Sequence, residues 1–149
     1  MAMSNPVALD QGRSPIDVRI RMSALWVATM LVFLYVDLFS LYREDVRQDL
    51  DDGRIFVFEV GQPFLLGITA YVIIPCLMVY LTLVMPRRIN RIVSIVVASI
   101  YAITIAGAAV GEWAYFVLGS LVEVVLLAIV IRLAWTWRES QRQEGSQIA

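Results

Sequence analysis

The chain has 149 residues, 60% of them hydrophobic, and a mean hydropathy of +0.75. This composition is too apolar for a soluble domain of that length, and a single domain is expected. The formal net charge of −1 gives no overall field that would favour nucleic acid as a partner.

Residues 1–21 form a polar segment ahead of the first apolar run. Pro6, Asp10, Pro15 and Asp17 interrupt this segment. The apolar run that follows is longer than the hydrophobic region of a signal peptide and lacks a small-residue cleavage site. We therefore predict a polar N-terminal tail over residues 1–21 and a first membrane span that is retained.

Four long apolar runs, separated by short charged breaks, fill most of the chain after residue 21. A helix rises about 1.5 Å per residue, so about 20 residues cross a hydrocarbon core roughly 30 Å thick. The sequence therefore predicts an all-α integral membrane four-helix bundle as a single domain over residues 22–134, with a C-terminal tail over residues 135–149. The predicted spans are residues 22–42, 64–85, 92–110 and 113–134.

Arginines indicate the orientation of the bundle. Three of them lie in the string PRRINR between the second and third spans, whereas the break between the third and fourth spans has none. Because basic residues remain on the cytoplasmic side, we expect both termini and the PRRINR turn in the cytoplasm. The loop over residues 43–62 also carries three arginines, but they lie among acidic residues, and we expect this loop outside.

The loop over residues 43–62 is the only connection with room for structure of its own. Asp51, Asp52 and Gly53 predict a turn within it. The apolar run over residues 55–58 is too short to span a membrane. We expect this run to lie at the membrane interface or to cap the bundle.

Small residues and one proline indicate how the spans pack. Ala98 and Ala102 lie four residues apart in the third span, and Gly107 and Gly111 form a GxxxG pattern. In lipid, small residues let helices approach closely, so the third span is expected at the centre of the bundle or at the seam of a homodimer. In the second span, Pro75 leaves a backbone carbonyl without its helical donor, and a kink is expected there.

Glu123 is the residue best placed to carry chemistry, because it falls near the middle of the fourth span. A carboxylate at that depth costs about 3 kcal/mol on insertion scales, so it should be paired, protonated or turned toward a water-filled cavity. Gly119 and Ser120 lie one turn away on the same face and leave space beside it. Glu112 lies about three turns earlier on nearly the same stripe.

Asp37 in the first span is the expected counterpart of Glu123. If the first and fourth spans are neighbours, Asp37, Glu112 and Glu123 form a ladder of carboxylates. Nearby carboxylates in a low dielectric cannot all ionise, so at least one should bind a proton or a cation near neutral pH. The structural alternative is that Glu123 only hydrogen-bonds another helix and that Asp37 caps its helix or reaches outward.

Motifs of several enzyme classes are missing. The chain has no histidine, which excludes HExxH zinc sites, Ser-His-Asp triads and His-ligated haem. Its one cysteine, Cys76, excludes a CxxC redox pair, and neither a P-loop nor a GxGxxG pattern occurs. We therefore expect no metal and no cofactor, and an enzyme is the least favoured class.

Residues 23–26 (SALW) and 33–41 (FLYVDLFSL) carry a family resemblance. They resemble the opening of a family of small bacterial four-span membrane proteins of unknown function. The overall layout is also similar, more distantly, to DoxX-like four-helix membrane proteins. The resemblance implies a compact four-helix bundle in the bacterial cytoplasmic membrane, and it implies no activity.

Three functions remain open. The first is a binding or transport module that handles a proton, a cation or a small solute through Glu123, Asp37 and Glu112, with Ser120 beside them. The second is a structural or accessory subunit without a site of its own, and the third is a quinone-linked membrane enzyme, by analogy with DoxX. A cavity that reaches Glu123 would favour the first function, whereas a dry bundle with a large exposed apolar patch would favour the second. The expected partners are the lipid bilayer, a small molecule or ion of unknown identity and, if the third span forms a dimer seam, a second copy of the chain.

Overall fold

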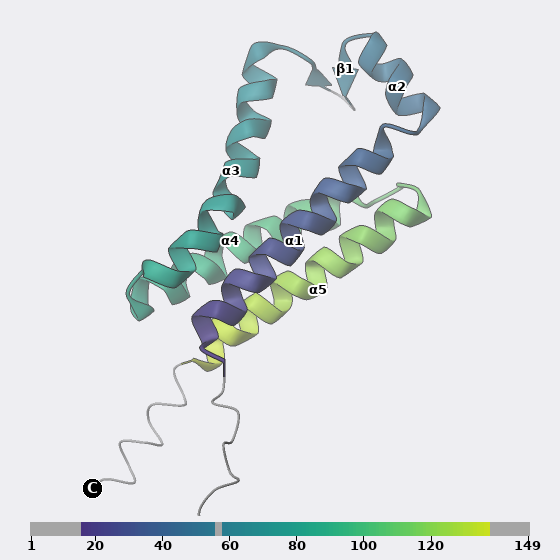
Figure 1. The fold of residues 1–149 in the computed structure, drawn as a ribbon. Helices are drawn as coiled ribbons and strands as arrows, with labels where there is room; N and C mark the ends of the chain where they lie inside the picture. Colours follow the sequence, from purple (N-terminus) through teal and green to yellow (C-terminus); the bar gives the residue numbers. More distant parts are fainter. Residues whose placement is uncertain (1–15, 56–57, 138–149) are drawn as a thin grey trace, which may run out of the picture.

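The computed structural model describes residues 16–55 and 58–137. It contains four helices that are long and apolar enough to cross a membrane, as the sequence predicts. A short helix and a two-stranded hairpin join the first two of them (Figure 1). The helices are α1 (Val18–Ser40), α2 (Glu44–Asp51), α3 (Gln62–Val84), α4 (Arg87–Ala108) and α5 (Ala114–Thr136), and the strands are β1 (Arg54–Ile55) and β2 (Phe58–Glu59).

Each long helix extends beyond one end of the apolar run that predicts it and stops one or two residues short of the other end. The side chain of Asp17 accepts a hydrogen bond of 2.8 Å from the backbone N–H of Arg19 and caps α1, so residues 18–21 of the expected tail are helical. α4 begins directly after Pro86, so the PRRINR string forms its first turn and is not a loop. Residues 1–15 and 138–149 of the two expected tails lie outside the described residues.

The connection between α1 and α3 is more structured than the sequence predicts. Residue 51 is the last residue of α2, and the turn that follows is centred on Gly53, whose φ of +71° favours glycine. Ile55 of β1 then pairs with Phe58 of β2 in an antiparallel hairpin. The short apolar run at this point is therefore split between two strands, and its central residues 56–57 lie outside the described residues.

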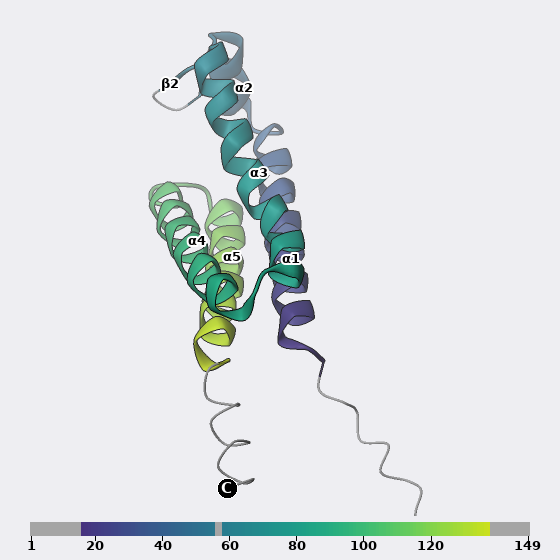
Figure 2. The same ribbon diagram turned by 90° about the vertical axis from the view of Figure 1, so that its left-hand side faces the viewer.

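The four long helices alternate in direction, so the start of α1 and the end of α5 lie at the same end of the molecule (Figure 1). We call this the terminal end, and the opposite end, which carries α2 and the hairpin, the hairpin end. α5 packs along both α1 and α4, whereas α3 packs mainly on α1. α3 and α4 meet at the terminal end and diverge toward the hairpin end (Figure 2).

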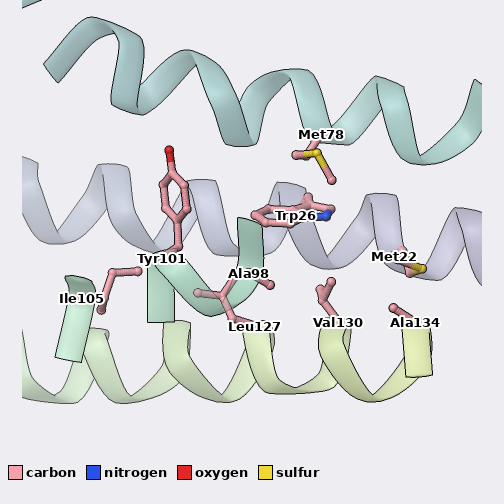
Figure 3. Packing of buried hydrophobic residues seen from close by; sticks show 9 residues of the cluster. All are labelled: Met22, Trp26, Met78, Ala98, Tyr101, Ile105, Leu127, Val130 and Ala134. Atoms are coloured by element: carbon pink, nitrogen blue, oxygen red, sulfur yellow. The ribbon is translucent and has the colours of Figure 1, made fainter. Parts of the chain in front are cut away.

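One regular seam organises the core. The buried residues of α5 recur at alternating intervals of three and four, the spacing of helices that interlock knobs into holes. They are Ser120, Glu123, Leu127, Val130 and Ala134. Near the terminal end, Trp26 of α1 lies between Val130 of α5 and Met78 of α3 (Figure 3). The apolar half of the core is thus centred on Trp26.

Candidate functional site

Glu123 lies on the buried seam of α5 and is only 2% exposed. Its Oε1 atom is buried and has no hydrogen-bond partner among the described residues. Nearly all buried polar groups in proteins have a partner, and an isolated carboxylate is costly in an apolar interior. The position therefore requires something that compensates the charge of Glu123.

A close contact between two helices lies one turn from Glu123. A Cβ atom added to Gly119 of α5 would overlap the Cγ2 atom of Val36 on α1. Only glycine permits this approach, which fixes the register of the two antiparallel helices. Ser120, the next residue of α5, is 4% exposed and lies on the same seam. Gly119, which the sequence places beside Glu123, therefore serves the contact with α1 and does not open space there.

Asp37 lies one residue beyond Val36, so the register places it about one and a half helical turns from Glu123, or about 7.5 Å along the axis, toward the hairpin end. Unlike Glu123, Asp37 is exposed on the surface of the described chain. Two carboxylates at this separation in a low dielectric interact unfavourably when both are ionised. Adjacent helices thus hold one buried and one accessible carboxyl group within electrostatic reach of each other.

Tyr71 of α3 and Thr104 of α4 place hydroxyl groups in the region of Glu123 and Asp37. The ring of Tyr71 stacks on that of Tyr101 of α4, with 4.5 Å between the ring centroids. Its hydroxyl forms a hydrogen bond of 2.8 Å with Oγ1 of Thr104. The Tyr71 ring also lies 6.2 Å from the ring of Phe33, which precedes Asp37 by about one turn of α1. All four long helices therefore contribute a polar side chain to this region.

Glu112 occupies a different site. It lies in the turn before α5, and its Oε2 accepts a hydrogen bond of 2.5 Å from Nη1 of Arg43. The side chains of Arg43 and Glu112 are 12% and 15% exposed. Arg43 also donates to Asp45, and its guanidinium lies 4.8 Å from the centroid of the Trp113 ring. These hydrogen bonds, to Asp45 first and to Glu112 next, hold the pKa of Arg43 above its ordinary value.

A family model identifies where this chain belongs. The model describes a family of unknown function, DUF6326, and it matches residues 17–144, which include all four long helices. The chain belongs to DUF6326. No curated protein and no solved structure matches it. The family assigns the chain no activity, and the four long apolar helices are what indicates a small membrane protein.

The small residues of α4 in this DUF6326 protein fall into two groups. Ala98 is fully buried in the core, and Ala102 is half-buried against it. Gly107 is exposed, and a Cβ atom added to it would meet no atom within 4 Å. Gly111 lies beyond the end of α4, in a turn where its φ is +84°. Within the described chain neither glycine forms a close helix contact, and association of two copies through them stays a prediction.

The pockets described for the DUF6326 protein do not include Glu123 in their lining. One of them lies between α1, α3 and α4 and is lined by residues that include Phe33, Tyr71 and Tyr101. Its volume of about 10 Å³ has room for roughly one water molecule. Among the described pockets, none therefore offers space for a solute of several atoms against Glu123.

Sequence reasoning missed Arg43, Tyr71 and Thr104. A signal for Arg43 existed, because it directly follows the first predicted span and Glu112 directly precedes the fourth. If those two spans are neighbours, the two side chains meet at the same membrane boundary. No comparable signal exists for Tyr71, because its position depends on how α3 bends.

Proposed function

We propose that this protein is a small binding or transport module that takes up a proton, or a cation in its place, at Glu123. One observation carries the proposal: Oε1 of Glu123 is buried without a hydrogen-bond partner among the described residues. A carboxylate in such a position needs a compensating charge. A proton supplies that charge without any additional space.

The packing around Glu123 favours a proton over a larger ligand. Within residues 16–55 and 58–137, no group of three or more Asp, Glu, Cys or His side chains is arranged to hold a metal ion. The small pocket between α1, α3 and α4, beside Phe33 and Tyr101, has room for roughly one water molecule. A solute of several atoms would require the helices to separate, whereas a proton would not.

Asp37 supports a route by which a proton reaches Glu123. It is exposed and lies about one and a half turns nearer the hairpin end. Two carboxylates near each other in a low dielectric interact unfavourably when both are ionised, so a proton on one favours ionisation of the other. A proton accepted at Asp37 can then pass inward to Glu123 through bridging water.

Substitution of Glu123 tests the proposal. Glu123→Gln keeps the shape and most of the hydrogen-bonding capacity but removes the titrating group. We expect this variant to fold with the stability of the wild type, to lose the pH-dependent carboxyl stretch in infrared difference spectra, and to lose any proton flux in proteoliposomes. Glu123→Leu removes the polar group altogether and separates the chemical role from a packing role.

Glu59→Gln is the matched control, because Glu59 is an exposed glutamate in β2. It should leave the infrared signal and the flux unchanged. If Glu123→Gln retains the wild-type signal and flux, while Glu123→Leu lowers the melting temperature, Glu123 serves only to join helices, and the proposed site is wrong.

An accessory subunit is the second candidate, and α3 is the observation that favours it. The part of α3 toward the hairpin end diverges from α4 (Figure 2) and exposes large apolar side chains. They include Leu65 at 53%, Leu66 at 64% and Ile73 at 47% exposed. A helix of another subunit could pack there in place of lipid. An accessory role requires no titration at Glu123, so under this role we expect Glu123→Gln to function as the wild type does.

We further propose that both termini face the cytoplasm and that the protein lies in a bacterial cytoplasmic membrane. Arginines at the terminal end support this orientation, because basic residues remain on the cytoplasmic side. Among the described residues, those near this end include Arg19, Arg21, Arg87, Arg88, Arg91 and Arg132. The acidic helix α2 then lies on the outer side.

A further inference from the structure

Among the described residues, six arginines gather at the terminal end with little compensating charge. They come from the first turns of α1, the first turns of α4 and the last turns of α5. Asp17 is the only acidic residue near this end in the described part of the chain, and its Oδ1 atom is bonded to the backbone of Arg19. The salt bridges between described residues all lie in or beside the connection at the hairpin end.

Two tryptophans at the end of α5 hold three of these arginines together. The guanidinium groups of Arg19 and Arg87 each lie 5.8 Å from the centroid of the Trp137 ring. The guanidinium of Arg91 lies 5.3 Å from the centroid of the Trp135 ring. Cation–π contacts therefore draw positive groups from α1 and α4 to one place on α5, although like charges repel.

The start of α4 adds to the excess of positive charge. Arg87 and Arg88 occupy its first turn, which contains no acidic residue and has no side-chain cap. The N-terminal end of a helix carries a partial positive charge, so arginines there are unfavourable and an anion is favourable. Arg19 is held in place differently, since its Nη1 atom donates a hydrogen bond of 3.0 Å to the carbonyl of Leu83 at the end of α3. A bound anion would offset the repulsion among these groups.

We propose that the cluster formed by Arg19, Arg87 and Arg91 around Trp135 and Trp137 binds the phosphate of an anionic phospholipid headgroup. Guanidinium groups bind phosphate oxygens through paired hydrogen bonds. Tryptophan rings favour the depth of the headgroups, where an apolar body meets a polar tip. Trp135 is 61% exposed, so its ring is available to a lipid. The cluster thus combines the charge, the geometry and the depth that a phospholipid headgroup requires.

Lipid binding to the full chain in detergent, measured by native mass spectrometry, tests this site. The probes are phosphatidylglycerol and phosphatidylcholine of the same chain length. We expect phosphatidylglycerol to bind more tightly, and the double substitution Arg19→Gln with Arg87→Gln to weaken it by about 25-fold, since each basic residue near an anionic headgroup contributes about fivefold. The preference should also fall as salt is raised.

Two variants keep the test informative if the double variant folds poorly. Arg87→Gln alone changes an exposed side chain and should weaken phosphatidylglycerol binding about fivefold. Arg47→Gln changes an exposed arginine of α2 at the hairpin end and should have no effect. Melting temperatures in phosphatidylcholine nanodiscs establish that each variant is folded.

Inorganic phosphate distinguishes a lipid from a free anion. At the same concentration it should neither stabilise the protein nor displace phosphatidylglycerol, because it lacks the acyl chains that hold a lipid beside Trp135. Equal stabilisation by phosphate would overturn the assignment to a lipid. Equal binding of the two phospholipids, or an equal loss for Arg47→Gln and Arg87→Gln, would overturn the site. None of these outcomes depends on Glu123.

Discussion

The hydroxyl of Tyr101 on α4 donates a hydrogen bond to the backbone carbonyl of Tyr71 on α3. Tyr71 precedes Pro75 by four residues, and proline has no N–H to offer that carbonyl. Within a membrane such a freed backbone group must find another partner. α3 bends in its middle (Figure 1), and Tyr101 supplies the hydrogen bond that the bend leaves open. The helix pair α3–α4 is therefore joined at the point where α3 is weakest.

Tyr101→Phe should lower stability by about 1 kcal/mol, because it removes the hydroxyl and leaves the carbonyl unpaired. Pro75→Ala restores an N–H that can bond to the same carbonyl. We therefore expect Tyr101→Phe to cost less in the Pro75→Ala background than in the wild type. A double-mutant cycle of unfolding free energies in detergent measures the difference. Tyr80→Phe, at a tyrosine that is 63% exposed, should be neutral. Equal costs in both backgrounds would show that the Tyr101 hydroxyl does not compensate for the N–H that Pro75 lacks.

The sequence predicts the acceptor of this hydrogen bond but not its donor. The orphan carbonyl follows from the position of Pro75 alone. The donor does not, because the choice of Tyr101 depends on the register of α3 against α4. Hydropathy constrains the length of each helix but hardly its rotation or axial position, since every face of a membrane helix can be apolar.

Gly119→Ala should destabilise the protein by about 1–3 kcal/mol, because the added methyl group overlaps Val36 of α1 and forces the helices apart. Val36→Ala should restore part of the loss, since it removes the Cγ2 atom in question. Gly107→Ala is the matched control on α4, where an added Cβ meets no atom within 4 Å. Melting temperatures in one detergent compare the variants. A Gly107→Ala variant that loses as much as Gly119→Ala would contradict this assignment of the close contact.

The sequence places Glu112 and Glu123 on one helical stripe, but in the structure only Glu123 belongs to α5. Helical spacing relates the two only if one helix contains both. α5 begins at Ala114, and the left-handed turn at Gly111 precedes it, so the spacing does not extend to Glu112. Glu123 lies well inside the helix, where burial follows from its place among apolar residues. The sequence also leaves α2 unpredicted. Its apolar residues Val46 and Leu50 lie one turn apart, but eight mostly polar residues do not form the long apolar run that hydropathy detects.

Acid should weaken the connection at the hairpin end. The hydrogen bond from Arg43 lowers the pKa of Asp45 below its ordinary value of 3.8. A carboxyl group whose pKa is lowered on folding stabilises the fold above the unfolded-state pKa, and the contribution is lost as the pH falls through the lower, folded-state pKa. We therefore expect a loss of stability below about pH 4 that Asp45→Asn removes. Unfolding curves between pH 2 and 7, roughly the range spanned by carboxyl titration, measure it.

Arg43→Gln should cost more than Asp45→Asn at neutral pH. It leaves Glu112 without its partner at a position where the side chain is 15% exposed. Removing one member of a largely buried pair costs about 2 kcal/mol or more. Arg54→Gln, in a pair whose side chains are 60% and 66% exposed, serves as the control and should be nearly neutral. A similar small change for both arginines would show that the Arg43 pair is fully solvated.

The orientation of the bundle can be measured with single cysteines after replacement of Cys76. Asp51→Cys places a thiol on the exposed end of α2, and Arg88→Cys places one on the exposed start of α4. Arg88 is a better labelling site than Asn90 in the same part of α4. Asn90 is fully buried and donates a hydrogen bond of 2.7 Å to the carbonyl of Thr82. With the termini in the cytoplasm, a membrane-impermeant thiol reagent should label the cysteine at position 51 in intact cells. It should label the cysteine at position 88 only after the cells are opened. The reverse pattern would place α2 in the cytoplasm, and the excess of arginines at the terminal end would then lie outside, against the expected distribution of basic residues.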